Sequence, residues 1–295
     1  NYLKYQMKKK QPNFLLIGAP KAGTTSVANY LAEHPDIFIS NEKEPFYFAS
    51  DAIGKVSKED PMFDAIMKRA HLNKKSYYKL FESANEKLRG EATVHYLYHY
   101  DEVIPKVINE LGDIKIIILL RNPIERAFSN FNYQHQGQYC SFEKALELES
   151  QRKEKGYNSF WFYKEVGKYF TPVKVYLQEF SEVHVCFFED LVSNPVLFMQ
   201  DIYKFLETDN KFIPDIKKQY NQTFIPKSKL IHFLYYYRHK FNLKLKTPIF
   251  IKEKAFKTKK NLMNDTTKIY LKKYFKEDIK KLENLINKDL SHWYA

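Results

Sequence analysis

The sequence has little cysteine, little glycine and no long run of apolar residues. Cys140 and Cys186 are the only cysteines among 295 residues, and no cluster of cysteine and histidine has zinc-finger spacing. The 8 glycines and 12 prolines exclude a collagen-like or low-complexity chain. The longest apolar runs, such as residues 114–120, are far shorter than the roughly 20 residues that a membrane-spanning helix needs. We therefore expect a cytoplasmic protein with no disulfide framework and no transmembrane segment, and peripheral contact with a membrane stays open.

The residues that are present indicate a folded, basic protein. Lys and Arg number 48 against 35 Asp and Glu, so the formal net charge is +13. Hydrophobic residues make up 44% of the chain and aromatic residues 17%, which supplies enough apolar surface to offset the entropy of ordering. The charge favours an anionic partner, and nucleic acid, acidic lipid, acidic glycan and nucleotide are all candidates at this stage.

Three short apolar runs predict buried parallel strands, at residues 14–18, 115–120 and 183–188. A turn and a helical pattern follow each run. Strand, crossover helix and strand repeated in this way predict a three-layer α/β fold with a central parallel sheet. The last part of the chain is less regular and returns to helical spacing over residues 266–293. With no linker rich in Gly, Ser or Pro, we expect residues 12–295 to form a single domain with a helical, embellished C-terminal third.

The strongest local signal is segment 15–26, in which a strand runs into a glycine-containing loop and then a helix. Backbone N–H groups at the start of a helix bind anions, and Gly23 lets the backbone approach a ligand closely. The order is P-loop-like, and the spacing of Gly18 and Gly23 fits the pattern GxxxxGK[ST]. The lysine, however, is Lys21, and the residue after the second glycine is Thr24. The segment predicts a phosphate-type site with a displaced lysine.

A nucleotide kinase is the competing interpretation of this segment. A P-loop NTPase places a magnesium-binding aspartate at the end of a neighbouring strand, whereas the run 116–120 ends in Arg121. A cation at that strand end repels Mg²⁺ and attracts a phosphate. ATP-dependent phosphoryl transfer is therefore not the first choice.

Two segments resemble the cofactor motifs of sulfotransferases that use 3′-phosphoadenosine 5′-phosphosulfate (PAPS). They are residues 20–26 (Pro-Lys-Ala-Gly-Thr-Thr-Ser) and residues 121–129 (Arg-Asn-Pro-Ile-Glu-Arg-Ala-Phe-Ser). Further stretches resemble the bacterial and heparan-sulfate-type branch of that family, at residues 43–48, 90–93, 188–195, 226–228 and 282–293. The resemblance implies a sulfotransferase with a P-loop-like α/β fold and PAPS as cofactor.

The same resemblance implies which residues bind the cofactor. Lys21 would stabilise the bridging oxygen as the phosphosulfate bond breaks, while the loop binds the 5′-phosphate. Arg121 and Ser129 would hold the 3′-phosphate from a strand end and the following helix, at the sheet edge where α/β folds bind nucleotides. The expected cofactor-binding residues are Lys21, Ala22, Gly23, Thr24, Thr25, Ser26, Arg121, Ser129 and Lys227.

Sulfuryl transfer also needs a general base, because the acceptor loses a proton as its oxygen attacks. The resemblance implies that Glu44, in the segment Lys-Glu-Pro-Phe-Tyr-Phe, is this base and that Lys21 is the second catalytic residue. Glu42 is the alternative base, since residues two apart in an extended strand point the same way. Residues 92–95 lack the lysine and the aligned histidine of cytosolic sulfotransferases, which argues against a histidine base. The residues expected to contact the substrate are Glu42, Glu91 and His95.

The expected acceptor is a glycan, modified on a hydroxyl group. The lysine- and aromatic-rich stretch 227–260 combines stacking surfaces for sugar rings with positive charge. A small phenol or natural-product alcohol is the alternative, because the same aromatic side chains could line an apolar pocket. No metal is expected, since His95 and His99 have i, i+4 spacing but lack a third ligand. No nucleic-acid module is recognisable, and the rival classes are a kinase and a non-catalytic binder of anionic polymers. The oligomeric state stays open.

Overall fold

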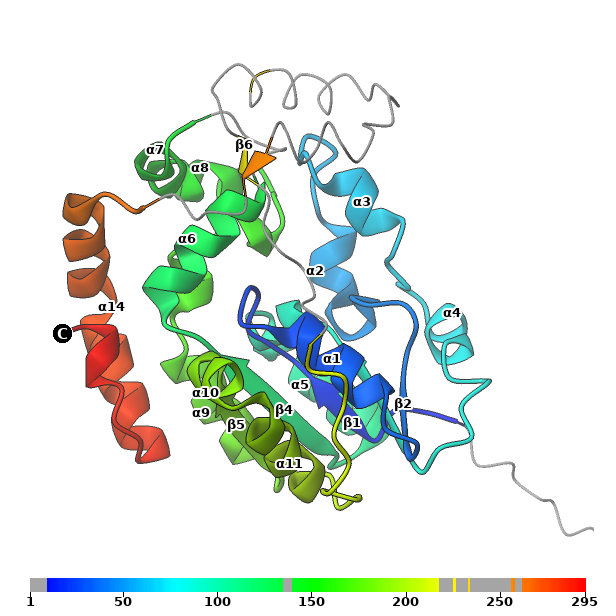
Figure 1. Cartoon of the computed structure of the whole chain (residues 1–295). Helices are drawn as coiled ribbons and strands as arrows, with labels where there is room; N and C mark the ends of the chain where they lie inside the picture. Colours follow the sequence, from blue (N-terminus) through cyan, green and yellow to red (C-terminus); the bar gives the residue numbers. More distant parts are fainter. Residues whose placement is uncertain (1–9, 135–139, 218–224, 227–232, 234–255, 258–261) are drawn as a thin grey trace, which may run out of the picture.

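The computed structural model describes residues 10–134, 140–217, 225–226, 233, 256–257 and 262–295 (Figure 1). The strands are β1 (Phe14–Leu16), β2 (Ile37–Ile39), β3 (Leu88–Ala92), β4 (Lys115–Leu120), β5 (Val183–Phe187), β6 (Ile225–Pro226) and β7 (Phe256–Lys257). The helices before β4 are α1 (Thr24–Ala32), α2 (Ser50–Gly54), α3 (Phe63–Met67), α4 (Lys74–Lys79) and α5 (Tyr100–Leu111). The later helices are α6 (Pro123–Tyr133), α7 (Phe142–Glu147), α8 (Glu149–Glu154), α9 (Phe170–Glu179), α10 (Phe188–Ser193), α11 (Pro195–Phe205) and α14 (Asp265–Ile286). Short 3₁₀ turns occur at Tyr47–Ala49, Val94–Leu97, Ser159–Trp161, Glu165–Gly167 and Ser291–Trp293.

The central sheet is parallel, with strand order β2-β3-β1-β4-β5. Because the strands are parallel, the segments that follow β1, β2, β3 and β4 all emerge at one edge of the sheet. The strand order reverses beside β1, since the chain goes from β1 toward β2 and later crosses from β3 to β4. Open α/β sheets bind ligands at such a point.

Helices cover both faces of the sheet. Right-handed crossovers place α1 on one face and α5 and α9 on the other. The packing agrees, because the Tyr203 hydroxyl of α11 donates to the carbonyl of Tyr30 in α1 at 3.1 Å, whereas α5 contacts α9. Figure 1 shows α14, coloured orange to red, on the outside of the molecule, and it packs against α6 and α9. The three-layer α/β fold expected from the sequence is confirmed.

The three strands predicted from apolar runs are present as β1, β4 and β5. The third ends at Phe187, because Phe188 already begins α10. In β4 the residues 116–120 have no solvent exposure, which is why an unbroken apolar run encodes it. The helical spacing seen over residues 266–293 is confirmed by α14 and the turn that follows it. Asn122 caps α6 through a hydrogen bond from the Ile124 N–H, with Pro123 at the first helical position as predicted.

Two strands of the sheet, β2 and β3, were not predicted. β2 is an apolar run of only three residues, Ile-Phe-Ile, and β3 reads Leu-Arg-Gly-Glu-Ala, which has no apolar run. Gly90 in β3 is required by packing, because a Cβ there would lie 2.3 Å from the ring of Phe14 on β1. β3 therefore depends on contacts across the sheet that a local pattern does not show.

Candidate active site

The loop after β1 and the start of α1 form an anion cradle. Gly23 is the N-cap of α1 with φ of 95°, and a Cβ there would lie 2.8 Å from Leu191, so only glycine suits the position. No side chain caps the start of α1, and its first turn holds no acidic residue. Backbone N–H groups at the positive end of the helix dipole are therefore available to an anion. The structure places Ala22 to Ser26 in this cradle, with Ala22 and Thr24 buried and Thr25 and Ser26 partly exposed.

Three cationic side chains converge on this cradle. Arg121, at the end of β4, donates through Nη1 to the carbonyl of Lys21 at 3.0 Å. The ammonium of Lys43, from the segment after β2, donates to the hydroxyl of Thr25. Burial, and then the charges of Arg121 and Lys43, lower the pKa of Lys21 to about 8. Such crowding of like charges suits a site that binds a multiply charged anion.

Aromatic rings support two of these cations. The ammonium of Lys21 lies 3.9 Å from the centroid of the Tyr133 ring, and the guanidinium of Arg121 lies 4.4 Å from that of Phe188. Ser129 is four residues before Tyr133 on α6, so both belong to one face of that helix. The structure therefore brings Arg121, Lys21 and the face of α6 that carries Ser129 together.

Glu44 is a buried carboxylate next to the cradle. Its Oε2 accepts a hydrogen bond from the N–H of Val94 at 3.0 Å, and its Oε1 lies 3.8 Å from the ammonium of Lys43. Its own N–H donates to the carbonyl of Ala92 at 3.1 Å, which ties the segment after β2 to the end of β3. Burial raises the pKa of Glu44, while Lys43 and the Val94 N–H act in the opposite direction. A carboxylate with a raised pKa, held near a cation cluster, suits a general base.

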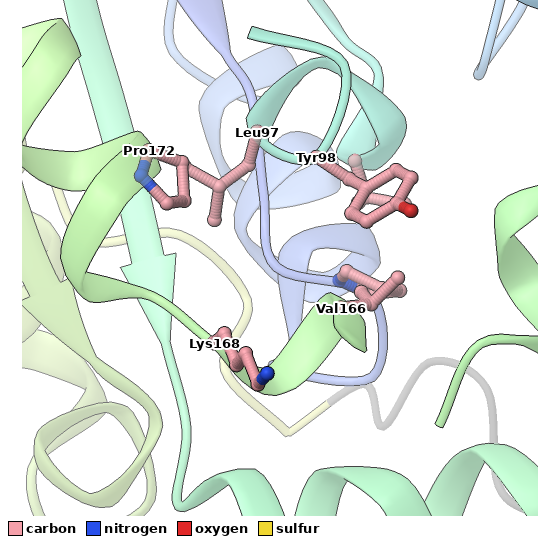
Figure 2. Close-up of a pocket in the computed structure, with 7 residues that line it drawn as sticks. Leu97, Tyr98, Val166, Lys168 and Pro172 are labelled. Atoms are coloured by element: carbon pink, nitrogen blue, oxygen red, sulfur yellow. The ribbon is translucent and has the colours of Figure 1, made fainter. Parts of the chain in front are cut away.

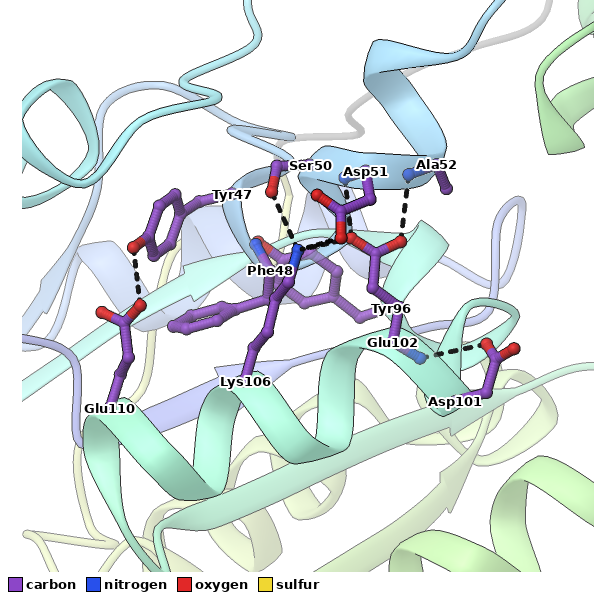
Figure 3. A network of polar contacts seen from close by, with 10 residues as sticks. All are labelled: Tyr47, Phe48, Ser50, Asp51, Ala52, Tyr96, Asp101, Glu102, Lys106 and Glu110. Carbon is purple, nitrogen blue, oxygen red and sulfur yellow. Dashed lines mark hydrogen bonds and ion pairs between the residues drawn. The ribbon is translucent and has the colours of Figure 1, made fainter.

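Helix α5 holds the segment that follows Glu44 (Figure 3). Glu102 accepts hydrogen bonds from the N–H groups of residues 51 and 52 at 2.7 and 3.0 Å, which caps the short helix α2. Glu110, two turns further along α5, accepts from the hydroxyl of Tyr47 at 2.7 Å. These bonds fix both ends of residues 47–52 and so limit where Glu44 can lie.

Glu42 is not placed as the sequence suggested. The expectation that Glu42 and Glu44 point the same way assumed an extended strand, but β2 ends at Ile39 and residues 41–43 form a bend. Glu44 itself has a left-handed backbone with φ of 62°. Glu42 is exposed, whereas Glu44 is 5% exposed. The expectation that the two side chains point the same way is therefore wrong.

Glu91 is too deeply buried for the substrate contact that was expected. It has no solvent exposure, and its oxygens accept hydrogen bonds from the hydroxyls of Tyr77 at 3.2 Å and Thr93 at 2.6 Å. Burial raises its pKa to about 7, with a smaller contribution from the charge of Glu44. In the structure Glu91 has a structural role, because its hydrogen bonds join the end of β3 to Tyr77 of α4.

His95 is also buried, at 3% exposure. Its Nδ1 lies 2.7 Å from the Ser159 hydroxyl, its Nε2 has no hydrogen-bond partner among the described residues, and the ring of Phe160 packs edge-on at 4.2 Å. Burial lowers the pKa of His95 well below its usual range, so the ring is neutral. The expected contact with substrate would need His95 to become accessible. The remaining site residue, Lys227, lies outside the described residues, as does most of stretch 227–260.

Two residues of the site were missed by sequence reasoning. Lys43 belongs to the segment 43–48 that carries the resemblance but has no expected role there, and its contact with Thr25 joins segments that no local pattern connects. Tyr133 lies one turn after Ser129, and this spacing was the available signal for it.

A small pocket borders the loop on another side (Figure 2). Its lining residues are Pro20, Val94, Leu97, Tyr98, Val166, Lys168 and Pro172. Figure 2 shows the apolar side chains of Leu97, Val166 and Pro172 around it. The ammonium of Lys168 lies 5.0 Å from the ring centroid of Tyr274. This mostly apolar lining suits packing behind the loop better than the binding of a phosphate.

The described part of the chain lacks two further features, a metal cluster and a membrane-spanning helix. No group of three or more His, Cys, Asp or Glu side chains there is placed to hold a metal ion. None of its helices has the length and apolar character to cross a membrane.

Comparisons with known proteins agree on one family. Residues 12–212 match the sequence profile of the sulfotransferase family. A crystal structure of a sulfotransferase from Alicyclobacillus acidocaldarius matches with a TM-score of 0.77 at 29% identity, covering 97% of this chain and 99% of that one.

Curated relatives match over a shorter region. The membrane-associated sulfotransferase kil1 of Dictyostelium discoideum is 34% identical over 125 residues, which is 42% of this chain and 23% of that protein. Carbohydrate sulfotransferase 15 of Homo sapiens is 26% identical over 151 residues, which is 41% of this chain and 27% of that protein. The matched region thus spans about a quarter of the length of these relatives.

Proposed function

Since this chain belongs to the sulfotransferase family, we propose that its site transfers a sulfuryl group from PAPS to a hydroxyl group of a carbohydrate. The observation that carries this proposal is the convergence of Lys21, Lys43 and Arg121 on the loop after β1, beside the buried carboxylate of Glu44. Cations suit the donor's phosphate and sulfate groups, and the carboxylate suits the acceptor's proton.

The proposed donor fits the cradle on chemical grounds. The N–H groups at the start of α1 and the hydroxyls of residues 24–26 would bind the 5′-phosphate. Arg121 and Ser129 would hold the 3′-phosphate, and a buried guanidinium is well suited to a phosphate because it donates two parallel hydrogen bonds. Arg121 also holds the carbonyl of Lys21, so it would couple 3′-phosphate binding to the shape of the loop.

The proposed reaction is an in-line displacement at sulfur. The acceptor oxygen forms a bond to sulfur, and the bond between sulfur and the 5′-phosphate oxygen breaks. Its electron pair stays on the phosphate, where Lys21 stabilises the charge that develops. The hydroxyl proton goes to Glu44, which must be ionised when the acceptor binds. The products are the sulfate ester and adenosine 3′,5′-bisphosphate (PAP).

A carbohydrate acceptor is the finer part of the proposal. It is supported by the likeness to carbohydrate sulfotransferase 15, which is limited to 41% of this chain. The net charge of +13 would favour a glycan that already carries anionic groups.

Calorimetry with PAP, compared with ATP and Mg²⁺, tests the proposal directly. We expect PAP to bind without Mg²⁺ and more tightly than ATP with Mg²⁺. Arg121→Ala should weaken binding of PAP by about 10- to 100-fold, the equivalent of one charge-assisted hydrogen bond. Binding of adenosine 5′-phosphate should weaken less, because it lacks the 3′-phosphate. Preference for ATP, or an equal loss for both ligands, would contradict the donor assignment.

Two broader expectations accompany the proposal. A single domain over residues 12–295 is supported by the packing of α14 on α6 and α9 and by the match to the bacterial sulfotransferase over 97% of the chain. A cytoplasmic location is supported by the low cysteine content, two residues in 295 with no disulfide between them. The relative described as membrane-associated makes fractionation of cells into soluble and membrane pools the appropriate check.

A further inference from the structure

Lys43 links the two halves of the site. Its ammonium donates to the hydroxyl of Thr25 in the cradle and lies 3.8 Å from Oε1 of Glu44. The side chain is 32% exposed, whereas that of Glu44 is 6% exposed, so the lysine lies between the buried carboxylate and the open side of the cradle. The backbone bond from Glu44 N–H to Ala92 fixes this arrangement against the end of β3.

The charges around Lys43 are not balanced within the described residues. Burial lowers the pKa of Lys43, and the charge of Arg69 acts in the same direction while Glu44 opposes it. Lys43 in turn contributes to the lowered pKa of Lys21. Two ammonium groups held this close to one loop cost electrostatic energy, which a bound anion with more than one negative charge would recover. One carboxylate, Glu44, cannot neutralise both.

We propose that Lys43 is a further catalytic residue, whose ammonium binds the oxygens of the sulfuryl group as it passes from donor to acceptor. The inference rests on the proposed function. Lys21 then stabilises the negative charge on the leaving phosphate oxygen, and Lys43 stabilises the charge on the oxygens of the sulfuryl group that is being transferred. The bonds formed and broken are those of the displacement at sulfur described above, and Lys43 remains protonated throughout.

The position of Lys43 has a second consequence for Glu44. A cation 3.8 Å from the carboxylate favours its ionised form and so opposes the effect of burial. The base is therefore ionised at a lower pH than burial alone would allow. Removing Lys43 should raise the pKa of Glu44 and move the acidic limb of the rate profile to higher pH.

The test compares Lys43→Met and Lys43→Arg with a control, Lys204→Met, which removes an exposed lysine on α11. Three quantities are measured: the Kd of PAP, which has no sulfuryl group, the Kd of PAPS, and kcat over a range of pH. For Lys43→Met we expect the Kd of PAP to stay within about threefold, the Kd of PAPS to rise, and kcat to fall by about 10²- to 10³-fold. Lys43→Arg should recover part of kcat, and Lys204→Met should match the wild type.

Other outcomes overturn the inference. A kcat of Lys43→Met within a few fold of wild type would show that no sulfuryl contact is made. Equal losses of PAP and PAPS affinity at unchanged kcat would place Lys43 in the phosphate cradle instead. Failure of the proposed function is recognised separately, because the wild-type protein itself would then bind no PAP.

Discussion

At the scale of single residues, the site depends on groups whose protonation the fold controls. Lys21 is the clearest case, because burial and the nearby charges of Arg121 and Lys43 bring its pKa to about 8. The loop residues could be found from the sequence, since a glycine, a lysine and hydroxyl residues between a strand and a helix form a local pattern. The protonation of Lys21 could not, because two of the groups that set it arrive from distant segments.

The lowered pKa of Lys21 predicts that PAP binding weakens as pH rises through about 8. Below this pH the lysine is charged and attracts the phosphate, and above it the lysine in the free protein is neutral. Between about pH 7, where the phosphates are already ionised, and about pH 9.5, the Kd should rise by about 10- to 30-fold, the upper figure being the most that loss of one proton allows. Calorimetry in buffers of different ionisation enthalpy should also show proton uptake on binding near pH 8. Lys21→Arg, which stays charged, should give a flatter profile, and a wild-type Kd that is constant over this range would contradict the prediction.

The burial of Glu44 and the exposure of Glu42 make a second prediction at this scale. Glu44→Gln keeps the shape of the side chain but cannot accept a proton, so kcat should fall by about 10²- to 10⁴-fold while the Kd of PAP is kept. Since the base must be ionised, the wild-type rate should rise with pH through the raised pKa of Glu44, and the variant should lose this limb. Glu42→Gln is the matched control and should retain activity. An active Glu44→Gln beside an inactive Glu42→Gln would transfer the role to Glu42.

Glu91 shows what burial without a cation does to a carboxyl group. Its pKa of about 7 in the folded protein is above the ordinary value, so its ionisation opposes folding as pH rises. Compared with Glu91→Gln, the wild type should lose stability on going from about pH 4.5 to pH 8, by on the order of 1–3 kcal/mol. Urea denaturation of both proteins at several pH values measures this difference. A stability difference that does not change with pH would mean that Glu91 titrates normally.

At the scale of elements, the residues of the site come together at the sheet edge where the parallel strands end. The strand β4 could be predicted from the sequence because it is buried on both faces and is therefore an unbroken apolar run. Arg121 follows it directly. β3 could not be predicted in the same way, because Glu91 is buried among hydroxyl groups and Gly90 is matched to the ring of Phe14. A local pattern therefore indicated the loop after β1 and the arginine after β4. Glu44, on the side that depends on β2 and β3, was expected only from the family resemblance, because its contact with Val94 joins segments that no local pattern connects.

The fit of Gly90 against Phe14 predicts a sharp steric limit in β3. Gly90→Ala would place a methyl group 2.3 Å from a ring that has no solvent exposure and little room to move. We expect a loss of about 1–3 kcal/mol in the free energy of unfolding, typical of overpacking. Gly54→Ala at the end of α2 is the control, since its Cβ would meet nothing within 4 Å. Urea denaturation should separate the two variants, and equal stability would show that β3 is not packed this tightly.

At the scale of the whole molecule, the net charge of +13 acts on every anionic ligand before it reaches the site. Part of this charge lies on the outer surface of α14, where Lys268, Lys273, Lys276, Lys280 and Lys281 are exposed. Such a field raises the local concentration of anionic substrates and has little effect on neutral ones. It also weakens with salt, because the screening length is about 10 Å at 0.1 M and about 3 Å at 1 M. The salt response of the reaction can therefore distinguish the two classes of acceptor.

We predict that kcat/KM for an acidic oligosaccharide falls steeply between about 0.05 and 0.5 M salt, at a concentration of PAPS that keeps the donor site saturated. A neutral phenol, measured beside it as the control, should show a shallow response, because it has no charge for the field to act on. Saturation with PAPS is essential, since the donor is itself an anion whose own binding weakens with salt. Mass spectrometry of the products identifies which acceptors are modified. Sulfation confined to phenols would contradict the carbohydrate proposal. An equal salt response for both acceptors would show that the positive charge of the chain attracts the donor and does not contribute to binding of the acceptor.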